Sequence, residues 1–209
     1  MTSPARASNG FPLAASHPKG LSHLNRIRKP RSGAYEVDYL ITPALGGTTT
    51  LTAWRIDAAR FRMDWDRGEG ARLYGGRWNA PGNAAVYCSL EPSTAILEVA
   101  VHTGFAMLAR IPHVITSMVI ANPATVHVIQ PEDVPDPAWL RPGWPSGAQQ
   151  AYGDALLDAH AFVLWPSTVS RLSWNLVCRP QRAAGHYQLA AQQALELDPR
   201  LNKPEPRRS

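Results

Sequence analysis

Several features that would assign a protein to a class at once are missing from this sequence. It has no apolar run near the roughly 20 residues that a membrane-spanning helix needs, and its first residues lack the long apolar stretch of a secretory signal. Its two cysteines, Cys88 and Cys178, lie in apolar segments without a neighbour at metal-ligand spacing. We therefore expect a cytoplasmic protein with no membrane contact, no bound metal, and buried, reduced cysteines.

Common catalytic motifs are absent as well. No Gly-Lys-Ser/Thr sequence follows a glycine-rich loop, which excludes a P-loop, and no HExxH pair suggests a zinc site. No GxSxG elbow surrounds a serine, so acyl transfer by a serine nucleophile has little support. The chemistry of this chain has to come from another arrangement.

The net charge of +5 comes from the two ends of the chain. Residues 1–33 carry six basic side chains and no acid, and residues 199–209 carry a net charge of +3, which leaves −4 for residues 34–198. A groove that follows nucleic-acid phosphates needs its positive charge on the folded surface. The sequence thus disfavours specific nucleic-acid binding, although a binding module that uses the basic tails and the seven tryptophans remains an alternative.

Composition divides the chain into three parts. Residues 1–34 are rich in Ser, Pro, Gly and basic residues and predict a flexible extension, residues 35–202 predict one compact domain, and residues 203–209 predict a tail. Short β-branched or aromatic runs predict strands, and two segments predict helices. The strand ranges are 35–42, 51–56, 84–89, 113–121, 125–129, 161–165 and 173–178, and the helix ranges are 92–104 and 146–160. Because helices do not alternate with strands, we predict an α+β domain with mixed or antiparallel sheets.

The connection between Asp57 and Ala84 is longer than the roughly 12–15 residues beyond which an unstructured connection tends to be functional or disordered. It contains Trp65, Tyr74 and Trp78, and this aromatic content predicts an ordered loop folded against the domain. Within "GGRWNAPG" (75–82), the glycines permit a tight turn that would present Arg77 to a cleft while Trp78 anchors the loop. An arginine held this way suits a phosphate or a carboxylate; the alternative is an internal salt bridge.

A narrow polar stripe marks the first predicted helix. Thr94, Glu98 and His102 are spaced by four residues among apolar neighbours, so they form either the solvent-exposed face of the helix or the wall of a polar cleft. Further along, "WPSTVSRLSWN" (165–175) places hydroxyl groups between two apolar runs, where most such groups act as local caps.

Taken together, "RGEGARLYGGRWNAPGNAAVYCSLEPSTAILEVAVH" resembles the signature of the RES domain family, the toxins of bacterial RES–Xre toxin–antitoxin pairs. The resemblance runs from "AWRI" to "LELDPRL", over residues 51–202. It implies a fold like that of ADP-ribosyltransferases, a cleft for NAD+, and cleavage of NAD+ by hydrolysis or phosphorolysis. Transfer of ADP-ribose to a protein acceptor is the alternative reaction. The implied partner is an Xre-type antitoxin with a helix-turn-helix.

The resemblance also implies roles for individual residues. The family's arginine, tyrosine, glutamate and serine fall on Arg77, Tyr87, Glu98 and Ser167, and we expect these four to be catalytic. Arg77 and Tyr87 would also bind NAD+, together with the residues Trp78 and Asn175. Ser170 and Ser173 are alternatives for the serine, and this chain has Arg179-Pro180 where many relatives have Asn-Pro.

With NAD+ as the substrate, the chemistry fits these residue types. Cleavage of the nicotinamide–ribose bond makes the ribose oxocarbenium-like, and a carboxylate such as Glu98 stabilises the positive charge. Arg77 would grip a phosphate oxygen, Tyr87 would stack on nicotinamide or ribose, and Ser167 would position a ribose hydroxyl or a phosphate.

Overall fold

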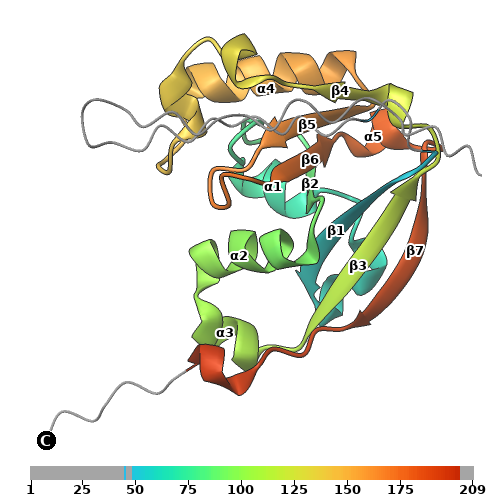
Figure 1. Cartoon of the computed structure of the whole chain (residues 1–209), viewed down its shortest axis with the longest axis vertical. Helices are drawn as coiled ribbons and strands as arrows, with labels where there is room; N and C mark the ends of the chain where they lie inside the picture. Colours follow the sequence, from blue (N-terminus) through green and yellow to red (C-terminus); the bar gives the residue numbers. More distant parts are fainter. Residues whose placement is uncertain (1–44, 46–48, 203–209) are drawn as a thin grey trace, which may run out of the picture. The chain divides into compact units, whose positions relative to one another are not determined.

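A single mixed sheet organises the domain. The structure is a computed structural model that describes residue 45 and residues 49–202. The seven strands of the sheet lie in the order β4-β5-β6-β2-β1-β3-β7; β4 and β5 run parallel and the other neighbours run antiparallel (Figure 1). The strands are β1 (Leu51–Ala58), β2 (Val86–Ser89), β3 (His113–Ile120), β4 (Val126–Val128), β5 (Phe162–Pro166), β6 (Trp174–Cys178) and β7 (Tyr187–Ala194).

Six of these strands lie within or overlap the predicted ranges, because each is short and rich in β-branched or aromatic residues. The predicted strand at 35–42 lies outside the described residues. The sequence did not reveal β7, "YQLAAQQA", which is mostly exposed and, among the described strands, pairs with β3 alone at the edge of the sheet. Alanine and glutamine do not favour strands, so β7 owes its conformation to its pairing with β3.

Five α-helices are present in the described part of the chain: α1 (Glu69–Tyr74), α2 (Pro92–Thr103), α3 (Phe105–Arg110), α4 (Gly147–Ala159) and α5 (Pro180–Ala183). The two predicted helices are α2 and α4. Proline in the first turn starts α2, and Gly104, with φ of 76°, ends it. The Ser146 hydroxyl accepts a hydrogen bond from the Gln149 amide and caps α4.

The connection from Asp57 to Ala84 is ordered, as expected, but it is not one continuous loop. It contains the 3₁₀-helix η1 (Ala59–Asp64) and the helix α1. Trp65 and Trp78 are 6% and 2% exposed. Tyr74 differs from the expectation, since it is 83% exposed and does not anchor the segment. It is the last residue of α1, and its side chain projects away from the core.

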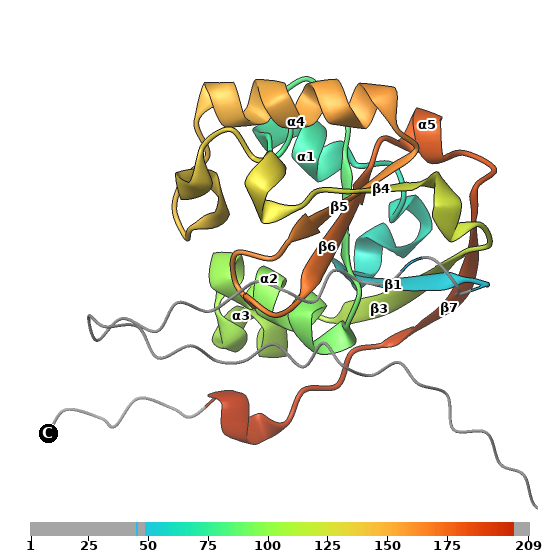
Figure 2. The ribbon, with the colours of Figure 1, turned by 45° about the horizontal axis from the view of Figure 1, so that its top comes forward.

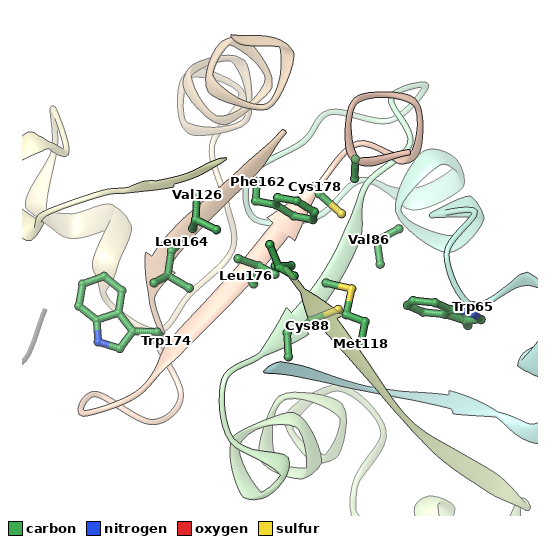
Figure 3. Packing of buried hydrophobic residues seen from close by; sticks show 13 residues of the cluster. Trp65, Val86, Cys88, Met118, Val126, Phe162, Leu164, Trp174, Leu176 and Cys178 are labelled. Carbon is green, nitrogen blue, oxygen red and sulfur yellow. The ribbon is translucent and has the colours of Figure 1, made fainter. Parts of the chain in front are cut away.

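Successive side chains along the central strands point to opposite faces of the sheet. On one face, Val86 and Cys88 of β2 belong to an apolar cluster with Met118 and Leu176 (Figure 3). Burial leaves both cysteines as free thiols in this face and raises the pKa of Cys88 to about 12. The expectation of buried, reduced cysteines is thus confirmed.

The opposite face carries two separate apolar clusters, each beneath one helix. Residues of α4, among them Leu157, pack on β5 and β6, whereas α2 packs through Ala95 on Ile56 of β1. Figures 1 and 2 show α4 and α2 apart from each other, with β2, β5 and β6 between them. Tyr87 lies on this face of β2, and Ser89, two residues later, projects on the same side. Polar side chains from the central strands thus reach the region between the two helices.

None of the helices in the described residues is long and apolar enough to cross a membrane. The predicted basic extension at 1–34 and the tail at 203–209 lie outside the described residues, and so does most of the segment that precedes β1.

Gly153 generates a prediction about stability. It lies inside α4, and a Cβ there would come within 2.7 Å of the Trp78 Cα, so α4 packs directly on the backbone of the "GGRWN" segment. Gly153→Ala should therefore lower the free energy of unfolding by about 1–3 kcal/mol, as overpacking does. Gly147 of the same helix has nothing within 4 Å. In urea unfolding, Gly147→Ala should be neutral or stabilising by up to about 1 kcal/mol; equal behaviour of the two variants would contradict the close packing.

Candidate active site around Glu98

The Glu98 carboxylate receives two hydrogen bonds on the same oxygen. Ser167 Oγ donates to Glu98 Oε1 at 2.8 Å, and Asn175 Nδ2 donates to that oxygen at 2.5 Å. Ser167 directly follows β5, Asn175 lies in β6, and Glu98 lies in the middle of α2. Neither of these bonds uses the second oxygen, Glu98 Oε2. The carboxylate is therefore oriented through Oε1, and these two hydrogen bonds do not occupy Oε2.

Both donors are oriented by further hydrogen bonds. Ser167 Oγ accepts from the amides of Val169 and Ser170 at 3.2 and 3.0 Å, so its hydroxyl proton is directed to Glu98. Asn175 Oδ1 accepts from Ser89 Oγ at 2.7 Å, which fixes the amide with its nitrogen toward Glu98. Ser89 and Asn175 are direct partners in the register of β2 and β6. The sheet register therefore determines which way the carboxylate is bound.

The three candidate serines have different partners. Ser167 bonds Glu98, and the Ser170 amide supports Ser167. Ser173 Oγ bonds Thr94 Oγ1 at 2.9 Å and also bonds the Glu91 carboxylate. In the described part of the chain, Ser167 is thus the serine of the three that contacts Glu98.

The predicted polar stripe of α2 does not form a single surface. Thr94 is 3% exposed, Glu98 is half-buried, and His102 is exposed near the end of the helix. Glu98 therefore belongs neither to a solvent face nor to a continuous polar wall with His102. The polar environment of Glu98 comes from Ser167 and Asn175, which lie far away in the sequence.

Arg77 is half-buried and binds backbone carbonyls. Its guanidinium donates to the carbonyl oxygens of Trp139, Arg141 and Gly143 at 3.2, 3.4 and 2.9 Å. Burial lowers the pKa of Arg77, and the negative charge of Glu98 opposes that shift. No ion pair forms at Arg77 within residues 49–202, so the internal salt bridge that the sequence left open does not occur there. Arg77 thus contributes a positive charge within electrostatic range of Glu98.

The half-buried Tyr87 and the fully buried Asn79 form a polar pair. The Tyr87 hydroxyl donates to Asn79 Oδ1 at 2.7 Å and accepts a hydrogen bond from the Trp78 amide at 3.0 Å. Burial raises the pKa of Tyr87, so the phenol is protonated at neutral pH and able to donate. The Tyr87 hydroxyl is therefore engaged with the loop, and a role against NAD+ remains a prediction.

Sequence reasoning missed Asn79, which is fully buried. Its amide nitrogen donates to the carbonyls of Ala71, Ala80 and Asn83 at 2.9, 3.2 and 2.9 Å. The signal was present in "GGRWNAPG", because asparagine among glycine and proline commonly bonds nearby backbone groups. Asn79 ties both ends of the turn that carries Arg77.

Asp154 and Arg179, whose contacts the sequence did not predict, attach this turn to α4. Asp154 of α4 accepts from the Ala80 amide at 3.0 Å and from Asn83 Nδ2 at 2.8 Å, and its other oxygen accepts from Arg179 at 2.9 Å. Arg179 is 8% exposed and also bonds the Ala84 carbonyl. Arg179, noted in the sequence as a departure from the Asn-Pro of many relatives, thus compensates a buried aspartate and holds the turn.

The tight turn expected at the glycines of "GGRWN" is present, because the Gly76 amide donates to the Asn79 carbonyl at 2.9 Å, and Gly76 has a further reason. A Cβ on Gly76 would lie 2.5 Å from the Tyr87 hydroxyl and 2.7 Å from Asn79 Oδ1. Gly75 adopts φ of 73°, which favours glycine. Gly75 therefore permits the turn, and Gly76 lets the backbone approach the Tyr87–Asn79 pair. The presentation of Arg77 to a cleft remains a prediction.

Trp78 lies on the core side of the same turn. Its ring stacks on Trp165 of β5 with centroids 3.8 Å apart and planes 10° apart. This burial confirms that Trp78 anchors the segment. A role of Trp78 in binding NAD+ remains a prediction, and so does that of Asn175.

The Tyr87–Asn79 pair generates a test of stability. Tyr87→Phe would leave a buried amide oxygen and the Trp78 amide without their partner, and we expect the free energy of unfolding to fall by about 1–3 kcal/mol. Tyr74→Phe removes the hydroxyl from a tyrosine that is 83% exposed and should change little. Urea unfolding of both variants checks this; similar losses, or none, would show that the pair does not hold the turn.

The chain is also similar in sequence to known proteins. The sequence profile of the RES domain matches residues 52–198. The chain is 29% identical over 155 residues to Toxin Res of Yersinia enterocolitica, which covers 72% of this chain and 99% of that protein. It is 30% identical over 139 residues to the Prs ADP-ribosylating toxin of a Sphingobium species, covering 63% of this chain and 83% of that protein.

Among solved structures, a chain of the Mycobacterium tuberculosis MbcT-MbcA toxin–antitoxin complex shares the fold. The TM-score is 0.56 at 23% identity, over 70% of this chain and 84% of that one. The predicted α+β fold, a single domain with a mixed sheet, is thereby confirmed. With the profile matched over most of the described domain, this chain belongs to the RES domain family.

Proposed function

We propose that this protein is the toxin of a toxin–antitoxin pair and consumes NAD+ by cleaving the nicotinamide–ribose bond. The observation that carries the proposal is the Glu98 carboxylate, which Ser167 and Asn175 fix through one oxygen alone. The Yersinia relative, which matches this chain over 99% of its own length, is named as a toxin. The Sphingobium relative is named as an ADP-ribosylating toxin. An ADP-ribosylating enzyme uses the ADP-ribose half of NAD+, and its first step is the loss of nicotinamide.

Cleavage of this bond places positive charge on the ribose while nicotinamide departs as a neutral molecule. A carboxylate that is already oriented stabilises this charge without reorganisation during the reaction. In the proposed mechanism Glu98 Oε2 faces the ribose, and Ser167 and Asn175 act through Glu98 by holding its other oxygen. This replaces the expected contact of Ser167 with a ribose hydroxyl or a phosphate.

Arg77 would supply the positive charge for the pyrophosphate. It is close enough to Glu98 for their charges to interact, and it forms no ion pair with a carboxylate of the described residues. A dinucleotide bound with its ribose at Glu98 would bring its phosphates toward this guanidinium. Arg77 thus fits the role of an electrostatic anchor that also holds the 139–143 segment through its carbonyls.

A second candidate function is transfer of ADP-ribose to a protein. The name of the Sphingobium relative favours it. Both functions share the cleavage step at Glu98 and differ in the acceptor, which is water or phosphate in the first and a protein side chain in the second.

The proposed partner is an antitoxin, because a solved structure that shares this fold is a toxin–antitoxin complex. An Xre-type antitoxin with a helix-turn-helix is the form we propose for this chain. The alternative of a nucleic-acid-binding module rests on the basic ends, which lie almost wholly outside the described residues.

The test is incubation of the purified protein with NAD+ labelled in the adenosine half, with and without phosphate and cell lysate. We expect nicotinamide release by the wild-type protein. Glu98→Gln keeps the shape and the hydrogen-bond acceptor but removes the charge, and we expect about a 100-fold or larger loss of rate. The matched control is Glu91→Gln at the N-cap of the same helix, where the carboxylate accepts hydrogen bonds from Ser173 and Thr94 instead.

The position of the label identifies the acceptor: ADP-ribose, its phosphorylated form, or a modified protein. Glu98→Gln with the wild-type rate would overturn the proposed role of the carboxylate. Equal losses in both glutamine variants would indicate a general effect on α2, which thermal unfolding would detect.

A further inference from the structure

Trp144 is the most exposed of the large apolar side chains in the described residues, at 97%. The indole of tryptophan is large and mostly apolar, and it is usually well buried. In residues 45 and 49–202, no ring contact involves Trp144. Its side chain thus offers both faces of an aromatic ring to solvent.

The segment that leads to Trp144 is held by hydrogen bonds and by packing. The Arg77 guanidinium binds the carbonyls of Trp139, Arg141 and, immediately before Trp144, Gly143. Leu140 is 6% exposed and Trp139 packs on Tyr152 of α4, so the base of the segment is anchored in the core. Pro142 and Pro145 flank the Gly143-Trp144 pair and restrict its backbone. An aromatic ring held on such a support binds a flat ligand without a large loss of conformational entropy.

Arg77 also connects Trp144 to the reaction centre. The Glu98 charge acts on Arg77, and Arg77 bonds the residue next to Trp144. These two links connect three groups in the order carboxylate, guanidinium and the segment that carries the indole. NAD+ presents its chemistry in the same order, with the nicotinamide ribose, the pyrophosphate and then the adenine base.

We propose that Trp144 binds the adenine base of the dinucleotide by stacking, while Arg77 positions the segment that carries it. This inference rests on the proposed function, since it takes NAD+ as the ligand. A stacked base has no need of hydrogen-bond partners, which agrees with the absence of a polar side chain in the Gly143-Trp144-Pro145 sequence. Trp144 is therefore a binding residue that determines preference for a substrate with a base at its far end.

The experiment compares ligands with and without the base. Isothermal titration measures binding of ADP-ribose and of ribose 5-phosphate, and steady-state kinetics measure cleavage of NAD+ and of nicotinamide mononucleotide. We expect Trp144→Ala to weaken ADP-ribose binding about tenfold and to raise the KM for NAD+ similarly, with kcat unchanged. Ribose 5-phosphate and nicotinamide mononucleotide, which lack adenine, should not distinguish the variant from the wild type.

Two further variants serve as controls. Trp144→Phe keeps an aromatic face and should retain most of the affinity for ADP-ribose. Met63→Ala removes another exposed apolar side chain, 75% exposed in η1, and should have no effect on either ligand.

The outcomes separate this inference from the proposed function. If the wild-type protein binds ADP-ribose in a Trp144-dependent way but does not release nicotinamide, the base site stands and the proposed reaction fails. If Trp144→Ala binds ADP-ribose as the wild type does, or loses both ligands equally, the base site is overturned. The base site is also overturned if the wild-type protein does not bind ADP-ribose. It is overturned as well if Trp144→Ala weakens binding of a protein partner but not of ADP-ribose.

Discussion

The geometry of the candidate site depends on two hydrogen bonds to one oxygen of Glu98. A half-buried carboxylate is costly unless donors compensate it, and here Ser167 and Asn175 do so from two neighbouring strands. Each donor is fixed in turn, Ser167 by backbone amides and Asn175 by Ser89. A shift of β6 by one residue would turn Asn175 to the other face and release the carboxylate.

The turn that carries Arg77 is supported separately, by buried polar groups. Asn79 bonds three carbonyls and Tyr87, and Asp154 links the turn to Arg179. Such networks specify one arrangement when all their members are satisfied. Both sets of contacts include a residue from the same face of β2. Tyr87 bonds Asn79 and Trp78 of the turn, and Ser89 bonds Asn175, which in turn bonds Glu98.

The sequence predicted most strands, both longer helices and the family, because these depend on local composition and on ordered motifs. It did not predict β7, whose alanines and glutamines form a strand only through β3. It predicted the tight turn at the "GGRWN" glycines, but not the close approach of Gly76 to Tyr87 and Asn79. Partners such as Asp154 and Ser89 were missed because their roles depend on contacts with residues more than 70 positions away. The roles of individual site residues toward NAD+ remain predictions.

The partners of Glu98 lie 69 and 77 residues beyond it in the chain. During synthesis, Arg77 and Glu98 leave the ribosome before β5 and β6 have been made. At that stage the carboxylate lacks the hydrogen bonds from Ser167 and Asn175 that orient it. Domains with such long-range strand pairing complete their structure late. Under the proposed mechanism, this order would delay activity until nearly the whole domain has emerged, and a chain cut short before Ser167 would lack an oriented Glu98.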